Sequence, residues 1–264
     1  MSQDPYALRY GTPEPPRPGL LRNPVLDLIL DHRSVRAFLP DPLAPEVLPT
    51  LVAAAQSAAS FSNLQWWSVL AVEDPERKRR LAVLSGNQAH IQAAPLFLIF
   101  LVDYARLRAV AVRHGVAPAF LSSFDGWTAA VSDAHLGAQN AVLAAESLGL
   151  GTVYIGTLRR DPAAVAEVLG LPPEVFAVIG ISIGKPDPSR PTRIKPRLSQ
   201  SVVFHQETYH PTDFSEIERY DQRLAELDAG SAVPESLWSR RTANRLSRAG
   251  SLAQAARRLG FKFE

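Results

Sequence analysis

Apolar and polar positions alternate along the chain in blocks that predict a sheet of four strands connected by helices. Continuous apolar runs at 96–102 and 175–183 are typical of strands that are buried on both faces. Shorter runs rich in β-branched and aromatic residues, at 67–72 and 152–155, predict the other strands.

Apolar residues that recur every three or four positions predict the helices. The longest such stripe covers 128–148, where the many alanines indicate close packing against another helix. Gly149 and Gly151 follow it, and we expect both to end it as C-terminal caps. Asp161 and Pro162 suit the N-cap and first turn of another helix. Further helices are predicted at 25–30, 45–56, 75–84, 103–113, 161–169, 214–227 and 237–259, with a short one opening after 86–88.

These elements predict an α+β fold with a single layered domain over residues 25–264. Helices outnumber strands and do not alternate strictly with them. The preceding residues 1–24 contain many prolines, and we expect an extended arm outside the packed core.

Composition limits the chemistry that the chain can perform. Of its 264 residues, 46% are hydrophobic and 20% charged, with a net charge of +2, as in ordinary globular proteins. Basic residues are scattered except near the C-terminus, so nucleic acid is not expected as the main partner. Cysteine is absent, which excludes disulfides, thiolate metal ligands and cysteine nucleophiles. Redox chemistry would therefore require a bound cofactor.

Motifs for targeting, metals and common nucleotide sites are missing from the sequence. The apolar stretch at 95–102 is too short to span a bilayer, and the N-terminus lacks the apolar core of a signal peptide. We therefore expect a cytoplasmic protein without a membrane partner. No dinucleotide-binding GxGxxG, P-loop or paired-histidine spacing occurs, and no metal is expected.

A basic segment at 31–38 is a candidate phosphate site. Arg33 and Arg36 flank Ser34 and Val35, between an apolar turn of helix and two prolines. Guanidinium groups bind phosphate oxygens bidentately, and Ser34 adds a hydroxyl and a backbone N–H. The same residues also fit an ordinary solvated turn. A second basic element, Lys195-Pro196-Arg197, lies far downstream.

A polar loop rich in serine and asparagine lies at 57–68. Such a segment fits a simple connection before a strand, but it also offers backbone and side-chain donors to a polar ligand.

Several short segments together resemble one known family, the oxygen-insensitive NADPH nitroreductases and FMN reductases, in its major type-A group. The resemblance covers roughly residues 24–220, with a weaker match at Leu237-Trp238-Ser239. The segments that carry it occur in this order: His32-Arg33-Ser34-Val35-Arg36-Ala37-Phe38, Asn63-Leu64-Gln65, Gly86-Asn87-Gln88-Ala89-His90, 138–151, Val153-Tyr154-Ile155-Gly156, Gly184-Lys185-Pro186 and Lys195-Pro196-Arg197-Leu198.

The resemblance implies a homodimer with an α/β/α sandwich fold, a mainly antiparallel central sheet, and FMN in a groove at the dimer interface. Arg33, Ser34, Lys195 and Arg197 match the family's phosphate-binding residues. The independent interpretation of the basic segments agrees, because a flavin phosphate carries close to two negative charges.

The resemblance also implies roles around the flavin ring. Arg36 would lie by the N1 and C2 carbonyl edge and stabilise the reduced flavin. No catalytic side chain is expected, since the flavin N5 carries the chemistry. A backbone N–H within 154–156 would contact N5, and the 60–63 loop would reach the cofactor from the partner subunit. The full set of further expected cofactor contacts is His32, Ser60, Ser62, Asn63, Gln65, Gln88, Tyr154, Ile155, Gly156 and Thr157.

Some residues depart from the family pattern. Phe61 interrupts a run that is all serine in the family, and Trp66-Trp67 is bulkier than expected, so it either reshapes the pocket or fills the core. The family binds the NADPH 2′-phosphate through arginines in a loop that here, at 229–236, has no arginine and one glutamate. The choice between NADH and NADPH therefore stays open, with Arg240 and Arg241 as possible substitutes.

The expected function is an FMN-dependent oxidoreductase with a ping-pong mechanism. NADH or NADPH would donate hydride, and a nitroaromatic, a quinone or a free flavin would accept two electrons. Two alternatives stay open: a specialised flavoenzyme of the same fold with a specific substrate, and a non-catalytic flavin-binding protein.

Overall fold

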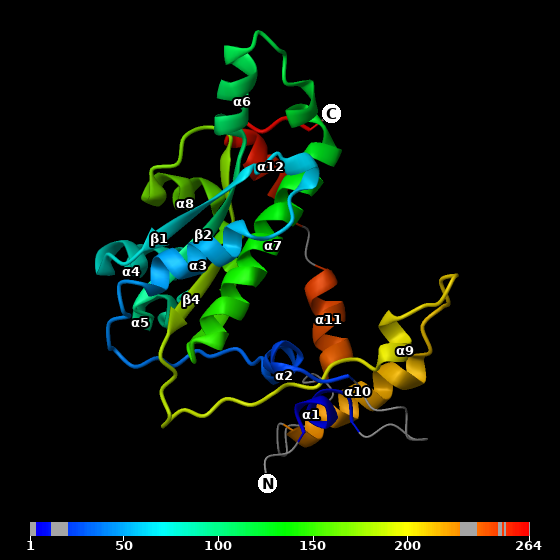
Figure 1. Cartoon of the computed structure of the whole chain (residues 1–264). Coiled ribbons are helices and arrows are strands. Elements are labelled where there is room, and N and C mark those ends of the chain that lie inside the picture. Colours follow the sequence, from blue (N-terminus) through cyan, green and yellow to red (C-terminus); the bar gives the residue numbers. More distant parts are fainter. Residues whose placement is uncertain (1–3, 12–20, 228–236, 248–249, 251, 264) are drawn as a thin grey trace. The chain divides into compact units, whose positions relative to one another are not determined.

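The structure is a computed structural model that describes residues 4–11, 21–227, 237–247, 250 and 252–263. The chain forms two compact units, which we describe separately. Unit 1 comprises Met1–Arg33 and Arg193–Gly250, and unit 2 comprises Ser34–Thr192 and Ser251–Glu264. Figure 1 shows the elements of both units in sequence colours. Whether 25–264 acts as one domain, as the sequence predicts, stays a prediction.

Unit 2 contains the predicted sheet. Its strands are β1 (Trp67–Val72), β2 (Leu96–Asp103), β3 (Gly151–Ile155) and β4 (Val175–Gly184). They form a four-stranded sheet in the order β1-β2-β4-β3, and every neighbouring pair is antiparallel. All four predicted strands are thus confirmed, and so is the antiparallel character of the sheet.

Helices cover both faces of this sheet. Alternate residues of β2 point to opposite faces, so Leu98 and Phe100 join one hydrophobic cluster while Phe97 and Ile99 join the other. On the first face lie α3 (Val47–Gln56), α7 (Phe124–Ser147) and α12 (Leu252–Arg258). On the second lie α4 (Pro75–Leu84), α5 (Ala89–Ala93) and α8 (Pro162–Leu169). Figure 1 shows α3 beside α7 on the sheet. This arrangement confirms the predicted α/β/α sandwich.

The helix ends of unit 2 follow local capping rules. Asp161 accepts a hydrogen bond from the Ala164 N–H (3.1 Å), with Pro162 in the first turn of α8, as predicted. After α7, the Leu150 N–H donates to the Ala145 carbonyl (3.0 Å) while Gly149 has φ 75°. This is the left-handed glycine cap that was expected there.

Gly151, predicted as a second cap, instead begins β3. A Cβ at this position would lie 2.7 Å from the Val35 side chain, so glycine permits a close approach of two backbone segments.

The predicted helix at 237–259 is wrong as a single element. The structure has α11 (Trp238–Leu246) in unit 1 and α12 in unit 2. The sequence around Gly250 and Ser251 has low helix propensity, and Ala256 of α12 is fully buried in the core of unit 2. The remaining elements of unit 2 are α6 (Tyr104–Arg113), η1 (Phe61–Asn63), η2 (Ala119–Ser122) and η3 (Gly156–Arg160).

The described residues of unit 1 form helices and connecting segments. They are α1 (Pro5–Tyr10), α2 (Pro24–Asp31), α9 (Gln200–Val203), α10 (Phe214–Leu227) and α11. The predicted extended arm is therefore partly wrong, because α1 is helical. Asp4 caps it through the Tyr6 N–H (3.2 Å), and Pro5 occupies its first turn. Arg9 of this helix is only 5% exposed.

Candidate functional site

The predicted phosphate-binding residue Ser34 begins an extended segment alongside β3. Ser34 pairs with Thr152 in an isolated parallel bridge, and the Val35 N–H donates to the Thr152 carbonyl (2.8 Å). The Val35 side chain is buried against Gly151. Because side chains alternate along an extended backbone, its neighbours point the other way, and Arg36 is exposed.

Arg36 lies close to the loop that holds the predicted flavin contact Gln88. Burial lowers the pKa of His90, and the positive charge of nearby Arg36 lowers it further. His90 therefore favours its neutral form beside this guanidinium. Gln88 stands at the N-terminus of α5, where its N–H donates to the Ala82 carbonyl (3.2 Å).

The segment 154–157 lies near the same loop of unit 2. Tyr154 and Ile155 end β3, and Gly156 and Thr157 begin the η3 turn. The guanidinium of Arg160, at the end of that turn, lies against Gly86 in the Gln88 loop.

Tyr154 keeps its proton at neutral pH. Burial raises the pKa of its hydroxyl, and the Glu146 carboxylate raises it further. The protonated hydroxyl hydrogen-bonds to Gln139 Oε1 of α7 (3.1 Å). Unit 2 thus brings together five predicted contacts or contact segments around β3, namely Ser34, Arg36, Gln88, the end of β3 and the η3 turn.

The polar loop before β1 is held by one buried carboxylate, Asp133 of α7, which is 3% exposed. It accepts hydrogen bonds from the Ser60 hydroxyl (2.7 Å), the Phe61 N–H (3.0 Å) and the Trp66 indole N–H (2.9 Å). The Ser60 hydroxyl also accepts from the Gln65 N–H (3.0 Å). Ser60 therefore connects Asp133 to the Gln65 backbone and stabilises the conformation of the loop.

The same loop has unusual backbone angles. Ser62, Asn63 and Gln65 adopt φ values of 48°, 55° and 49°, in the left-handed region. Each such non-glycine residue costs about 1–2 kcal/mol, so surrounding contacts must hold the loop in place. Ser62 and Asn63 are exposed, as a ligand-contacting segment requires.

The aromatic residues that depart from the family pattern have structural roles. Trp66 is fully buried, and Phe61 stacks on it with ring centroids 5.9 Å apart. Trp67 packs against Gly137 of α7, where a Cβ would lie 3.0 Å from its ring. Trp66 thus fills the core.

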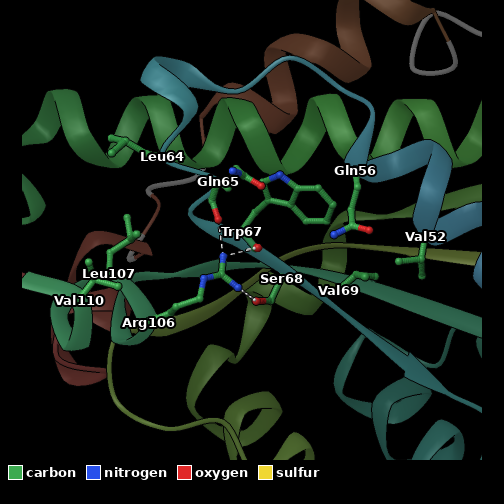
Figure 2. A pocket seen from close by; sticks show the side chains of 10 residues that line it. All are labelled: Val52, Gln56, Leu64, Gln65, Trp67, Ser68, Val69, Arg106, Leu107 and Val110. Atoms are coloured by element: carbon green, nitrogen blue, oxygen red, sulfur yellow. Dashed lines mark hydrogen bonds between the residues drawn. The ribbon is translucent and has the colours of Figure 1, made fainter.

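Trp67 also lines a pocket of about 530 Å³ between α3, β1 and α6. Figure 2 shows Arg106 at this pocket, donating to the carbonyl oxygens of Gln65 and Trp67 and to the Ser68 hydroxyl (3.1 Å). Of the predicted flavin contacts, Gln65 alone lines it.

One copy of unit 2 does not bring all its predicted contacts together. The polar loop leads into β1, whereas Tyr154 and Ile155 end β3, and these are the two edge strands of the sheet. Three strand spacings separate them, or about 14 Å at ~4.8 Å each.

Unit 1 contains the other predicted phosphate-binding residues. Lys195 and Arg197 are exposed, and Arg33 forms an ion pair with Asp31 (2.6 Å) at a side-chain exposure of 40%. The Arg197 N–H donates to the Arg9 carbonyl (2.8 Å). Through its side chain, Arg9 donates to the carbonyls of Leu30 (2.8 Å) and His32 (2.7 Å). Both basic segments therefore contact α1.

Within the ranges that the structure describes, no group of three or more histidine, aspartate or glutamate side chains is placed to hold a metal ion. No helix in the same ranges combines the length and apolar character needed to cross a bilayer.

Comparison with known proteins supports the predicted family. The "Nitroreductase family" model matches residues 29–185, and the "Nitroreductase family, C-terminal domain" model matches 195–264. The chain is 36% identical over 228 residues to the NADPH-flavin oxidoreductase of Vibrio harveyi, covering 85% of this chain and 92% of the relative. It is 39% identical over 207 residues to the FMN reductase [NAD(P)H] of Bacillus subtilis, covering 77% and 82%. This chain belongs to the nitroreductase family.

The fold of this nitroreductase-family chain also matches solved structures. The structure of NfrA2 from B. megaterium superposes with a TM-score of 0.85 at 36% identity, covering 92% of this chain and 100% of that one. The predicted nitroreductase-like fold is confirmed.

Sequence reasoning missed two supporting residues of this nitroreductase-family chain. Asp133 stands next to Ala134, which belongs to the buried alanine stripe of α7. A carboxylate beside a buried stripe was the sequence signal that a buried hydrogen-bond acceptor lies there. Arg9 was missed because its segment was predicted to be an extended arm on account of its many prolines. Asp4-Pro5 is nevertheless a typical helix start, and Gly11 is a typical helix end.

Proposed function

We propose that this chain is an FMN-dependent oxidoreductase that takes hydride from NADH or NADPH and reduces small aromatic or quinone acceptors. The observation that carries the proposal is the pair of basic segments in unit 1, ending at Arg33 and spanning Lys195–Arg197, which both contact one helix. Exposed cations held on a fixed backbone suit a dianionic phosphate. Family membership makes a flavin the phosphate-bearing group that fits.

The donor set also suits the rest of an FMN molecule. Arg36, exposed beside a neutral His90, supplies a positive charge for the pyrimidine edge of the ring. Gln88 offers a side-chain amide, and a backbone N–H where β3 meets η3 would serve N5 of the ring. When bound, FMN supplies the two-electron redox chemistry that this cysteine-free chain lacks. The protein's part is to bind and orient cofactor and substrates and to place charge near the ring.

We further propose that the active form is a homodimer in the cytoplasm. The polar loop and the end of β3 stand at opposite edges of one sheet, which leaves the loop's exposed Ser62 and Asn63 free to reach a cofactor bound by a second copy. In such a dimer, the loop would contact the cofactor in the backbone conformation that it has here.

Arg241 of α11 is a candidate contact for the hydride donor. The loop at 229–236 lies outside the described residues. In unit 1, burial raises the pKa of the Tyr220 hydroxyl. The positive charges of Arg197, Arg223 and Arg241 act against this rise, so Arg241 lies near Tyr220. Arg241 is exposed and is our candidate for the 2′-phosphate of NADPH.

Two assays on the purified protein test the proposal. The absorption spectrum and released cofactor should show one FMN per chain. Steady-state turnover with NADH and NADPH, against a nitroaromatic and a quinone, should show activity with at least one donor and acceptor. Stoichiometric FMN without turnover would favour a specialised flavoenzyme or a non-catalytic flavoprotein, and absence of FMN binding would refute the proposal.

A further inference from the structure

We propose that Arg9, in the arm before the nitroreductase-family match, is a positioning residue that sets the affinity for the phosphate of FMN. The inference rests on the proposed function, because it concerns the same phosphate site. Arg9 would not touch the phosphate; it would hold the backbone of both basic segments that do.

The side chain of Arg9 fixes the end of α2. Its Nη2 donates to Leu30 O (2.8 Å) and His32 O (2.7 Å), and its Nε donates to Leu30 O (3.3 Å). The last carbonyls of a helix lack partners within the helix, and a cation near them is favoured by the helix dipole. Arg9 therefore defines the path of the backbone just before Arg33.

The backbone of Arg9 fixes the second segment. Its carbonyl accepts from the N–H of Arg197 (2.8 Å), and Tyr220 supports the same segment by donating to the Pro196 carbonyl (3.2 Å). A single residue thus connects two segments that are far apart in the sequence.

Burial explains why this residue holds its place. Arg9 is 5% exposed, so its guanidinium has given up most contact with water and depends on its carbonyl partners. Arg33, Lys195 and Arg197, by contrast, remain accessible to a ligand. Fixing their backbones in advance reduces the entropy lost when the phosphate binds.

The test compares FMN with riboflavin, which lacks the phosphate. Apoprotein of the full chain is titrated with each flavin, and flavin fluorescence is followed. In Arg9→Met, FMN affinity should fall by about tenfold or more while riboflavin affinity stays near the wild-type value, since ~1.4 kcal/mol corresponds to a factor of ten. Arg9→Lys, which keeps the charge but loses the fork of donors, should lie between the two.

The matched control is Arg219→Met. Arg219 is an exposed cation of the same unit that bonds to Ser215 and Glu216 of its own helix, α10, and lies near Asp213 just before it. It should leave both affinities unchanged.

The possible outcomes separate the two proposals. An unchanged FMN-to-riboflavin ratio in Arg9→Met, or an equal loss for both flavins, would overturn the role of Arg9. If Arg9→Met does not fold, a wild-type ratio in Arg9→Lys would overturn it instead. A wild-type protein that binds both flavins equally would refute the phosphate site itself.

Discussion

Two candidate binding regions of this chain are each held by one buried charged residue, but in opposite ways. In unit 1, the arginine Arg9 donates to backbone carbonyls, and the supported segments expose cations. In unit 2, the carboxylate of Asp133 accepts from N–H and O–H groups, and the supported loop exposes hydroxyl and amide groups.

The difference shows how one chain can present cations in one region, for an anionic part of a ligand, and hydroxyl and amide groups in another, for a neutral polar part. A buried cation binds backbone carbonyls, and the segments that it holds expose cations, which suits an anion. A buried anion uses up N–H groups and holds strained backbone in place, which suits a shape-specific polar contact.

The largest effect is expected from removing the buried carboxylate. Asp133→Leu should lower the free energy of unfolding by about 3–5 kcal/mol, because the buried indole N–H of Trp66 and the donors of Ser60 and Phe61 lose their acceptor. Urea denaturation measures this. The exposed Asp125, on the same helix, provides the control Asp125→Asn, which should change stability by less than about 1 kcal/mol.

The next effect concerns binding, with little change in stability. The double variant Lys195→Met and Arg197→Met should weaken FMN binding by about 100-fold or more, since each charged hydrogen bond contributes roughly 1.5–3 kcal/mol and a factor of ten corresponds to ~1.4 kcal/mol. Riboflavin affinity and the urea midpoint should stay close to wild type, because both side chains are exposed. Arg79→Met, which removes an exposed cation paired with Glu76, is the control. A large loss of stability would show that these cations hold the fold together.

A smaller effect is expected where the Ser34 segment meets β3. Gly151→Ala places a methyl group 2.7 Å from Val35 and should cost about 1–3 kcal/mol of stability. It should also weaken flavin binding by shifting Ser34 and Arg36. Gly250→Ala, where a Cβ meets no atom within 4 Å, should be close to neutral. Equal effects at both positions would contradict the close approach at Gly151.

The smallest effect is electrostatic. Arg36→Gln should raise the pKa of His90 towards its ordinary value without reaching it, because burial, the larger cause, remains. Folded His90 binds a proton less readily than unfolded His90, so stability should fall as the pH drops through the ordinary histidine range, and less so in the variant. NMR titration of the histidine ring measures the pKa, and a wild-type value in the variant would contradict the proximity of Arg36.

The sheet and its covering helices could be predicted because they depend on local hydrophobic patterns. The buried strands at 96–102 and 175–183 and the capped helix after Asp161 are examples. The strand order could not be derived this way, since pairing depends on contacts between distant residues. The resemblance supplied only the mainly antiparallel character of the sheet.

The candidate site was predictable only as a set of residues. The family motifs supplied the names of its members, but Asp133 and Arg9 act through tertiary contacts that no motif records. The split near Gly250 was missed because the helical pattern continues on both sides of it.

The most direct test of the account is rapid mixing of the purified, flavin-loaded protein with NADH and with NADPH without oxygen, while flavin absorbance is recorded. We predict fast loss of the oxidised flavin signal with at least one donor, followed by its recovery when a quinone or nitroaromatic is added. If Arg241 binds the 2′-phosphate, NADPH should reduce the flavin faster than NADH does. Arg241→Met should then slow reduction by NADPH more than it slows reduction by NADH. A fully flavin-loaded protein that neither donor reduces would contradict the account.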